Sequence, residues 1–204
     1  SADLFTGAKQ VGAISVRRLR LLSDDGLILP CVIVEPKDPI NTVTFISDKG
    51  FMSEHDRIVK LASLGNRVIA IAPVFIGQSR HTGSLYSMPM LAATLGQRPL
   101  GIQTAQVTSA VEFILRTLVL EHTDLESHGP RSGVLALTAA ATSEHIVEVS
   151  TVGALSSIDE LLSPTASYSK TPEAYCFGLL RWFKSPQVSE VLSSPVVNLK
   201  KHLK

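Results

Sequence analysis

A turn flanked by two glycines stands between an expected strand and an expected helix in the middle of the chain. It reads Gly129-Pro130-Arg131-Ser132-Gly133. A Gly-x-Ser-x-Gly turn in this setting exposes a serine hydroxyl at its apex, because the small neighbours let strand and helix approach closely. Here the apex residue is Arg131, whose guanidinium stays protonated and offers no lone pair for attack on a carbonyl carbon. The segment therefore keeps the two glycines of a Gly-x-Ser-x-Gly turn but lacks its nucleophilic serine.

Ser132, one residue past the apex, is the alternative nucleophile. With a histidine such as His128, His81 or His145 and an acid such as Asp159, it could in principle form a proton relay. One residue past the apex, however, the side chain turns toward the first turn of the helix, where a serine commonly caps or begins that helix. We therefore expect no catalytic residue. If chemistry is present, the expected set is Ser132, His128 and Asp159.

Arg131 has two further interpretations. It could pair with Glu126 across the turn, as a structural ion pair. It could also bind an anion at the start of the 133–141 helix, where free backbone N–H groups and the helix dipole attract negative charge.

No metal site or cofactor is expected. His122 and Asp124 are two residues apart and have no third ligand near them in sequence. The two cysteines, Cys31 and Cys176, are too few for a disulfide framework or a metal cluster.

The composition excludes several classes of protein. The chain has 204 residues, of which 45% are hydrophobic and 18% charged, with a formal net charge of +1. A charged fraction below the roughly 25% of ordinary globular chains argues against disorder. A near-neutral charge gives no footprint for nucleic acid. The apolar runs are shorter than the ~20 residues of a membrane span, and no signal peptide is visible, so the compartment stays open.

Strand and helix signals alternate through the middle of the chain, which predicts right-handed crossovers and a mostly parallel sheet. The expected strands are 42–47, 67–72, 124–128 and 146–150, and the expected helices are 54–64, 103–120 and 134–142. Before them, 14–22 and 27–34 flank a turn at 23–26 and predict an antiparallel hairpin. The fold class is therefore α/β, with a mostly parallel central sheet flanked by helices and a hairpin at the N-terminal edge.

The length fits a single domain over 1–204. We divide it into an N-terminal hairpin at 11–35, an α/β core at 42–162 and an irregular C-terminal part at 163–204. In the last third of the chain we expect helical turns at 157–162 and 186–192, a short strand at 195–199 and a solvated basic tail at 200–204. An aromatic cluster also lies there: Tyr175, Phe177, Trp182 and Phe183.

The order and spacing of several motifs resemble the acetyl-xylan-esterase-like branch of the α/β-hydrolase superfamily. The segments that carry the resemblance are Leu95-Gly96, Pro99-Leu100-Gly101, Gln106-Val107, Ala110-Val111, the 133–141 helix and Phe177-Gly178-Leu179-Leu180. The resemblance runs from about residue 18 to about residue 195. It implies an α/β-hydrolase fold, in which the serine of a Gly-x-Ser-x-Gly turn, an acid and a histidine act together on esters.

Four features depart from the pattern of that family. Ser47-Asp48 stands where the family has a His-Gly turn, and 72–77 keeps only the final glycine of an Asp-x-Arg-Gly-x-Gly turn. Arg131 replaces the serine. The sequence also ends within a few residues of the expected strand at 195–199, which leaves no room for the last strand and the histidine loop.

These departures predict a degenerate, C-terminally shortened copy. Its expected role is a catalytically inactive structural or interaction module, either half of a tandem enzyme or an accessory subunit. A protein partner or tandem domain would cover the shortened side. The first alternative is a carbohydrate-directed or small acyl-ester serine hydrolase that uses Ser132. The second is a ligand-binding module with an anion site at Arg131.

Overall fold

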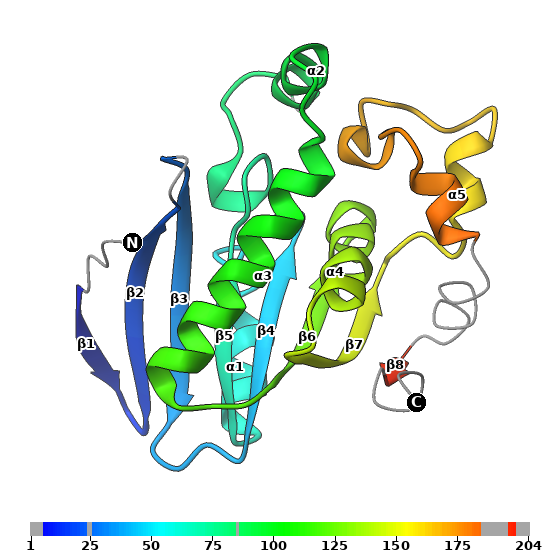
Figure 1. The fold of residues 1–204 in the computed structure, drawn as a ribbon. Helices are drawn as coiled ribbons and strands as arrows, with labels where there is room; N and C mark the ends of the chain where they lie inside the picture. Colours follow the sequence, from blue (N-terminus) through cyan, green and yellow to red (C-terminus); the bar gives the residue numbers. More distant parts are fainter. Residues whose placement is uncertain (1–5, 24–25, 85, 185–195, 199–204) are drawn as a thin grey trace.

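A mixed sheet forms the centre of the molecule (Figure 1). The computed structural model describes residues 6–23, 26–84, 86–184 and 196–198. Over these residues the strand order is β1-β2-β3-β5-β4-β6-β7-β8. The strands are β1 (Thr6–Val11), β2 (Ile14–Leu22), β3 (Ile28–Pro36), β4 (Asn41–Ser47), β5 (Asn66–Ile71), β6 (Thr123–His128), β7 (Ile146–Val152) and β8 (Val196–Asn198).

The four central strands β5, β4, β6 and β7 run parallel, whereas β1, β2 and β3 pair antiparallel at the N-terminal edge. The α/β class, the mostly parallel core and the N-terminal hairpin are thus confirmed. The strand expected at 195–199 lies partly outside the described residues. Its described part is β8, which pairs antiparallel with β7.

Helices cover both faces of the sheet, with α1 behind it and α3 and α4 in front of it in Figure 1. The helices are α1 (His55–Ser63), α2 (Ser87–Thr94), α3 (Pro99–Leu118), α4 (Pro130–Thr142) and α5 (Leu179–Phe183). Side chains of β5 show why both faces are covered. Val68 and Ala70 pack with α1, while Ile69 and Ile71 belong to the cluster on the α3 and α4 side.

Two helices begin four residues earlier than the periodicity predicts, and for the same reason. Helix α3 starts at Pro99 instead of residue 103, and α4 starts at Pro130 instead of residue 134. Proline suits the first helical position, because its fixed φ fits the helix and its missing N–H would be unpaired there. The turn at 129–133 is therefore mostly helix, and Arg131 and Ser132 lie in the first turn of α4.

The segment 153–184, which follows β7, has only short helical elements. It contains the short 3-10 helices η2 (Ile158–Leu162) and η3 (Pro172–Ala174), followed by α5. The helical turn expected at 186–192 and the basic tail at 200–204 lie outside the described residues. Over the residues that are described, every helix is too short or too polar to span a bilayer. The expected protein partner and the expected lack of nucleic-acid binding stay predictions.

Candidate functional site at the first turn of helix α4

Gly129 joins β6 to α4 in a conformation that favours glycine. Its φ is 112°, and a Cβ built at this residue would lie 2.4 Å from Cγ of Asp48. The second glycine of the turn, Gly133, lets the segment after β7 approach α4 closely. A Cβ there would lie 2.5 Å from Cβ of Ala154, in the segment after β7. The two glycines thus bring α4 close to the carboxyl ends of β4 and β7.

Asp48, immediately after β4, occupies the N-terminus of α4. Its Oδ2 accepts the backbone N–H of Arg131 at 3.2 Å, and its Oδ1 accepts the N–H of Ser132 at 2.6 Å. The Asp48 N–H donates to the His128 carbonyl at 3.0 Å, which fixes the end of β4 against the end of β6. Two backbone donors of one helical turn therefore converge on a single carboxylate, as expected where the helix dipole favours negative charge.

Arg131 forms a buried ion pair with Glu173 of η3. The side chains of Arg131 and Glu173 are 6% and 3% exposed. Arg131 Nε donates to Glu173 Oε2 at 2.9 Å, Nη2 donates to Oε1, and Nη2 also donates to the Phe75 carbonyl at 2.8 Å. Gln103 of α3 joins this group, because its Nε2 donates to the Val74 carbonyl at 2.7 Å and to Glu173 at 3.4 Å.

Two interpretations of Arg131 are corrected by this geometry. Its acidic partner is Glu173 and not Glu126, which lies on the other face of the sheet and pairs with Arg57. The anion site predicted at Arg131 is occupied by the protein itself. Glu173 neutralises the guanidinium, and Asp48 takes up the nearby backbone N–H groups.

Ser132 is buried, and its hydroxyl points back into the turn. The Oγ donates to the His128 carbonyl at 2.6 Å and lies 3.3 Å from the Gly129 carbonyl oxygen. A bond to the carbonyl four residues earlier is the usual arrangement for a serine inside a helix. The expectation that Ser132 lies in the first helical turn is confirmed.

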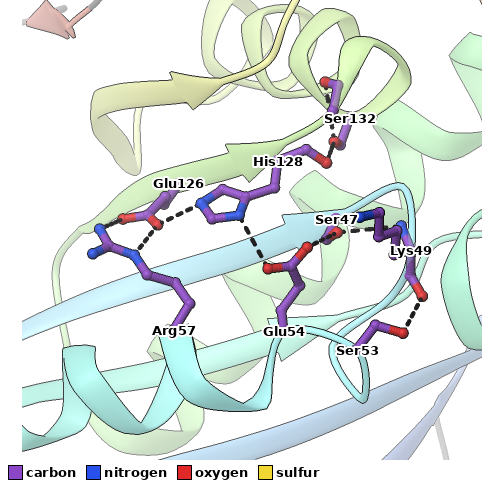
Figure 2. A network of polar contacts seen from close by, with 9 residues as sticks. Ser47, Lys49, Ser53, Glu54, Arg57, Glu126, His128 and Ser132 are labelled. Carbon is purple, nitrogen blue, oxygen red and sulfur yellow. Dashed lines mark hydrogen bonds and ion pairs between the residues drawn. The ribbon is translucent and has the colours of Figure 1, made fainter.

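The His128 ring is held away from Ser132, between two glutamates on the α1 side (Figure 2). Its Nδ1 lies 3.2 Å from Glu54 Oε2, and its Nε2 lies 2.9 Å from Glu126 Oε1. Asp159 forms an exposed ion pair with Lys184 at 2.6 Å. The structure therefore brings Ser132 and His128 together only through the His128 backbone. The Ser132 hydroxyl, the His128 ring and the Asp159 carboxylate do not form a relay.

A chain of polar contacts runs from Arg57 to Ser47 on this side of the sheet (Figure 2). Arg57 donates twice to Glu126, at 2.6 Å in each case, and Ser47 Oγ donates to Glu54 at 2.9 Å. Burial acts to raise the pKa of Glu126, but the hydrogen bonds and charges of Arg57 and His128 outweigh it and hold the pKa below its ordinary value. Glu126 is thus a carboxylate held in its ionised form.

Sequence reasoning missed Glu54, Arg57 and Glu173 as members of these networks. For the network around Glu126, the available signal was a charged residue inside a buried strand, because a buried carboxylate needs a cation nearby. Glu173 gave no comparable signal, since it lies in the irregular C-terminal part, 42 residues from its partner.

Neither a metal site nor a reactive thiol is found among the described residues. No group of three or more His, Cys, Asp and Glu side chains there could hold an ion. Cys31 and Cys176 are both free. Burial raises the pKa of the Cys31 thiol to about 12, so this group stays protonated near neutral pH.

Solved structures that share the fold of this chain include esterases and a hydrolase. The acetyl xylan esterase from Paenibacillus sp. R4 superimposes with a TM-score of 0.61 at 14% identity, over 95% of this chain and 65% of its own. A cold-adapted esterase from an Arctic intertidal metagenomic library gives 0.52 at 16% identity, over 72% and 62%. Dienelactone hydrolase from Anabaena variabilis ATCC 29413 gives 0.51 at 17% identity, over 78% and 70%. The chain has the α/β-hydrolase-type fold.

The expected family resemblance is confirmed at the level of this fold. The chain spans less than two thirds of the length of either esterase. No family model and no curated protein matches the sequence. The prediction of a catalytically inactive module is wrong in the light of these comparisons, because the α/β-hydrolase-type structures that share the fold are named as esterases and a hydrolase.

Proposed function

We propose that this chain is the core of a small acyl-ester hydrolase, and that the ester carbonyl is bound at the first turn of α4. One observation carries the proposal. The backbone N–H groups of Arg131 and Ser132 both point at one negatively charged group, the carboxylate of Asp48. The esterases that share the fold support the reaction class.

Ester hydrolysis places negative charge on the carbonyl oxygen as the tetrahedral intermediate forms. Enzymes stabilise this charge with fixed donors at about 2.7–3.1 Å from the oxygen. The Arg131 and Ser132 N–H groups are held in place by the helix and become available as such donors when Asp48 moves away. In the resting structure Asp48 takes the place of that oxygen, so an ester has to displace the Asp48 side chain.

Ser132 is the proposed nucleophile, because its hydroxyl belongs to the same helical turn as the two donors. Rotation about χ1 releases Oγ from the His128 carbonyl and turns it toward the bound ester. Oγ then forms a bond to the carbonyl carbon, its proton passes to a base, and the alcohol leaves with a proton. Water hydrolyses the acyl-enzyme in the second half of the reaction.

Asp48 is the proposed proton acceptor. Its carboxylate lies 2.6 Å from the Ser132 backbone nitrogen, within the same helical turn's surroundings as the hydroxyl that has to lose its proton. The His128 ring is unsuited to this step, since Glu54 and Glu126 hold both of its nitrogens on the α1 side.

Turnover of p-nitrophenyl acetate tests the proposal. We expect hydrolysis by the unmodified chain, its loss in Ser132→Ala, and a decrease of roughly a hundredfold or more in Asp48→Ala. Ser63→Ala is the matched control. Ser63 Oγ also donates to the carbonyl four residues earlier, but in the exposed part of α1. Far-UV circular dichroism checks that each variant is folded.

Two results would overturn the proposal. One is hydrolysis by the unmodified chain no faster than in buffer. The other is equal turnover in the folded Ser132→Ala and Ser63→Ala variants, since the hydroxyl of Ser132 would then play no part in the reaction.

A further inference from the structure

The His128 ring lies in a cluster of charged side chains on the α1 side of the sheet (Figure 2). Its Nδ1 lies 3.2 Å from Oε2 of Glu54, and its Nε2 lies 2.9 Å from Oε1 of Glu126. Each ring nitrogen thus faces a carboxylate oxygen. The side chains of His128, Glu54 and Glu126 are 17%, 18% and 7% exposed, so water screens the interactions between them only in part.

These two contacts determine how many protons the ring carries when both are hydrogen bonds. A carboxylate oxygen only accepts hydrogen bonds, so each contact needs an N–H group on the ring. A neutral imidazole has one N–H and one lone pair, whereas an imidazolium has two N–H groups. The imidazolium can therefore donate to Glu54 and Glu126 at once. In the neutral ring, the lone pair of one nitrogen faces a carboxylate oxygen, which is repulsive.

The other charged groups around the ring favour the same form. Apart from the ring, Arg57 of α1 is the one cationic side chain paired with the two glutamates in the described part of the chain. Two carboxylates and one guanidinium leave a negative charge unbalanced, and a second proton on the ring balances it. The neighbouring strands add no charge at this position, because Ser47 of β4 and Val152 of β7 lie opposite His128.

The two glutamates differ in how firmly they are held beside the ring. Glu126 lies within β6 and accepts two hydrogen bonds from Arg57, so it cannot withdraw. Glu54 is more exposed, and its other side-chain bond comes from Ser47 Oγ at 2.9 Å. When the ring is neutral, its remaining N–H therefore stays on Nε2, and Glu54 moves away from the lone pair on Nδ1.

Glu54 connects this cluster to the start of α1. It is the residue from which the helix begins, and its carbonyl accepts the backbone N–H of Ile58 at 3.0 Å. Its side chain and the His128 ring together join the first turn of α1 to the end of β6. Loss of the Glu54 contact thus removes a link between two elements and not only a surface ion pair.

We propose that His128 is a proton-dependent link between the end of β6 and the start of α1. In the imidazolium form the ring bonds both Glu126 and Glu54. When the Nδ1 proton passes to water, Glu54 withdraws and the first turn of α1 is less firmly held. The link is therefore formed at the acidic end of the pH range in which histidines titrate, and it is lost as the pH rises. It requires no catalysis by Ser132 and is independent of the proposed esterase reaction.

Proton NMR of the ring N–H groups tests the protonation step. We expect two slowly exchanging ring N–H protons of His128 at about pH 5.5 and one at about pH 9, beyond the range in which histidines usually titrate. The variant His128→Gln assigns these signals, because it removes them.

Hydrogen exchange of the Ile58 amide tests the loosening of α1, because its acceptor is the Glu54 carbonyl. After correction for the intrinsic exchange rate at each pH, its protection should be roughly tenfold greater at about pH 5.5 than at about pH 9.

Glu54→Gln separates the link from other effects of pH. A glutamine amide can accept from the imidazolium with its oxygen or donate to the neutral ring with its nitrogen. The pH effect on the Ile58 amide should therefore fall to about twofold or less. His55→Gln is the matched control, because it removes the neighbouring histidine, which is exposed, and should keep the full effect.

Three results would overturn the proposal. One is a number of ring N–H protons on His128 that does not change between the two pH values. The second is equal protection of the Ile58 amide at both. The third is a pH effect of the same size in Glu54→Gln as in the unmodified chain. None of these measurements involves turnover, so they give the same answer whether or not the chain hydrolyses esters.

Discussion

Two arginine–glutamate pairs lie near the end of β6, one on each face of the sheet, and they differ in burial. In the Arg131–Glu173 pair both side chains are almost fully buried, at 6% and 3% exposed. In the Arg57–Glu126 pair the glutamate is 7% exposed, but the arginine is 35% exposed. The first pair fixes the apex of the turn beside the proposed reaction centre. The second keeps contact with water and anchors the His128 ring.

This difference in burial determines what each pair contributes to stability. A fully buried pair gains little over apolar residues of the same volume, but removal of one partner leaves an uncompensated charge in the interior. A partly exposed pair loses less when it is broken, because water solvates the remaining charge. We therefore expect the loss in free energy of unfolding to be largest for the buried pair and smallest for an exposed pair.

The largest effect is expected for Glu173→Gln. This change leaves the Arg131 guanidinium buried without a counter-charge, so the free energy of unfolding should fall by about 3–5 kcal/mol. Urea unfolding monitored by circular dichroism measures it. The double variant Arg131→Met, Glu173→Leu should recover most of the loss. A decrease of less than about 1 kcal/mol in the single variant would show that the pair is not buried as described.

A smaller loss is expected for Gly129→Ala. Its Cβ would meet the Asp48 side chain at 2.4 Å, and a φ of 112° strains any residue with a Cβ. The free energy of unfolding should fall by about 1–3 kcal/mol in the same urea experiment. Asp48→Gly in the Gly129→Ala background removes the steric part and should restore some stability. If Gly129→Ala is neutral, the close approach of Asp48 to the turn is wrong.

We expect the Arg57–Glu126 pair to make the free energy of unfolding depend on pH in the acidic range. The pKa of Glu126 is lowered in the folded chain, so its contribution is present above the unfolded value of about 4.3. It is lost as the pH falls through the folded pKa. Arg57→Gln removes the main cause of the lowered pKa and should flatten this part of the curve, at a cost near neutral pH of about 1 kcal/mol or less. Urea unfolding at a series of acidic pH values gives both curves, and parallel curves would contradict the assignment.

The smallest effect is expected for Arg116→Ala. Arg116 and Glu112 are 75% and 54% exposed and are four residues apart on α3. Such pairs contribute about 0.3–0.5 kcal/mol, so the free energy of unfolding should change by no more than that. This variant calibrates the comparison, because a loss as large as that of Glu173→Gln would show that burial does not separate the pairs.

The sequence predicted the fold well, because the signals of its core are local. Alternating apolar strands and periodic helices placed the parallel sheet, and the turn at 23–26 placed the hairpin. The start of α4 was missed because Gly129-Pro130 resembles a turn, although proline also begins helices. That single shift moved Arg131 from the expected apex of a turn into the first turn of a helix.

The partners of the site residues were less accessible from the sequence. Arg131 meets Glu173, and Asp48 meets the N-terminus of α4, across 42 and more than 80 residues. Hydropathy and periodicity describe neighbours within one element, so they give no information on such contacts. The position of the turn was predictable, whereas the carboxylate that occupies it was not.

We propose Ser132, beside the two N–H donors of α4, as the nucleophile of an ester hydrolase. Labelling of the intact chain with a fluorophosphonate, followed by peptide mass spectrometry, is the sharpest test of this role. We expect one phosphonyl adduct on the peptide that contains Ser132, present in Ser63→Ala and absent in Ser132→Ala. An unlabelled chain, or an adduct on any other serine, would contradict it.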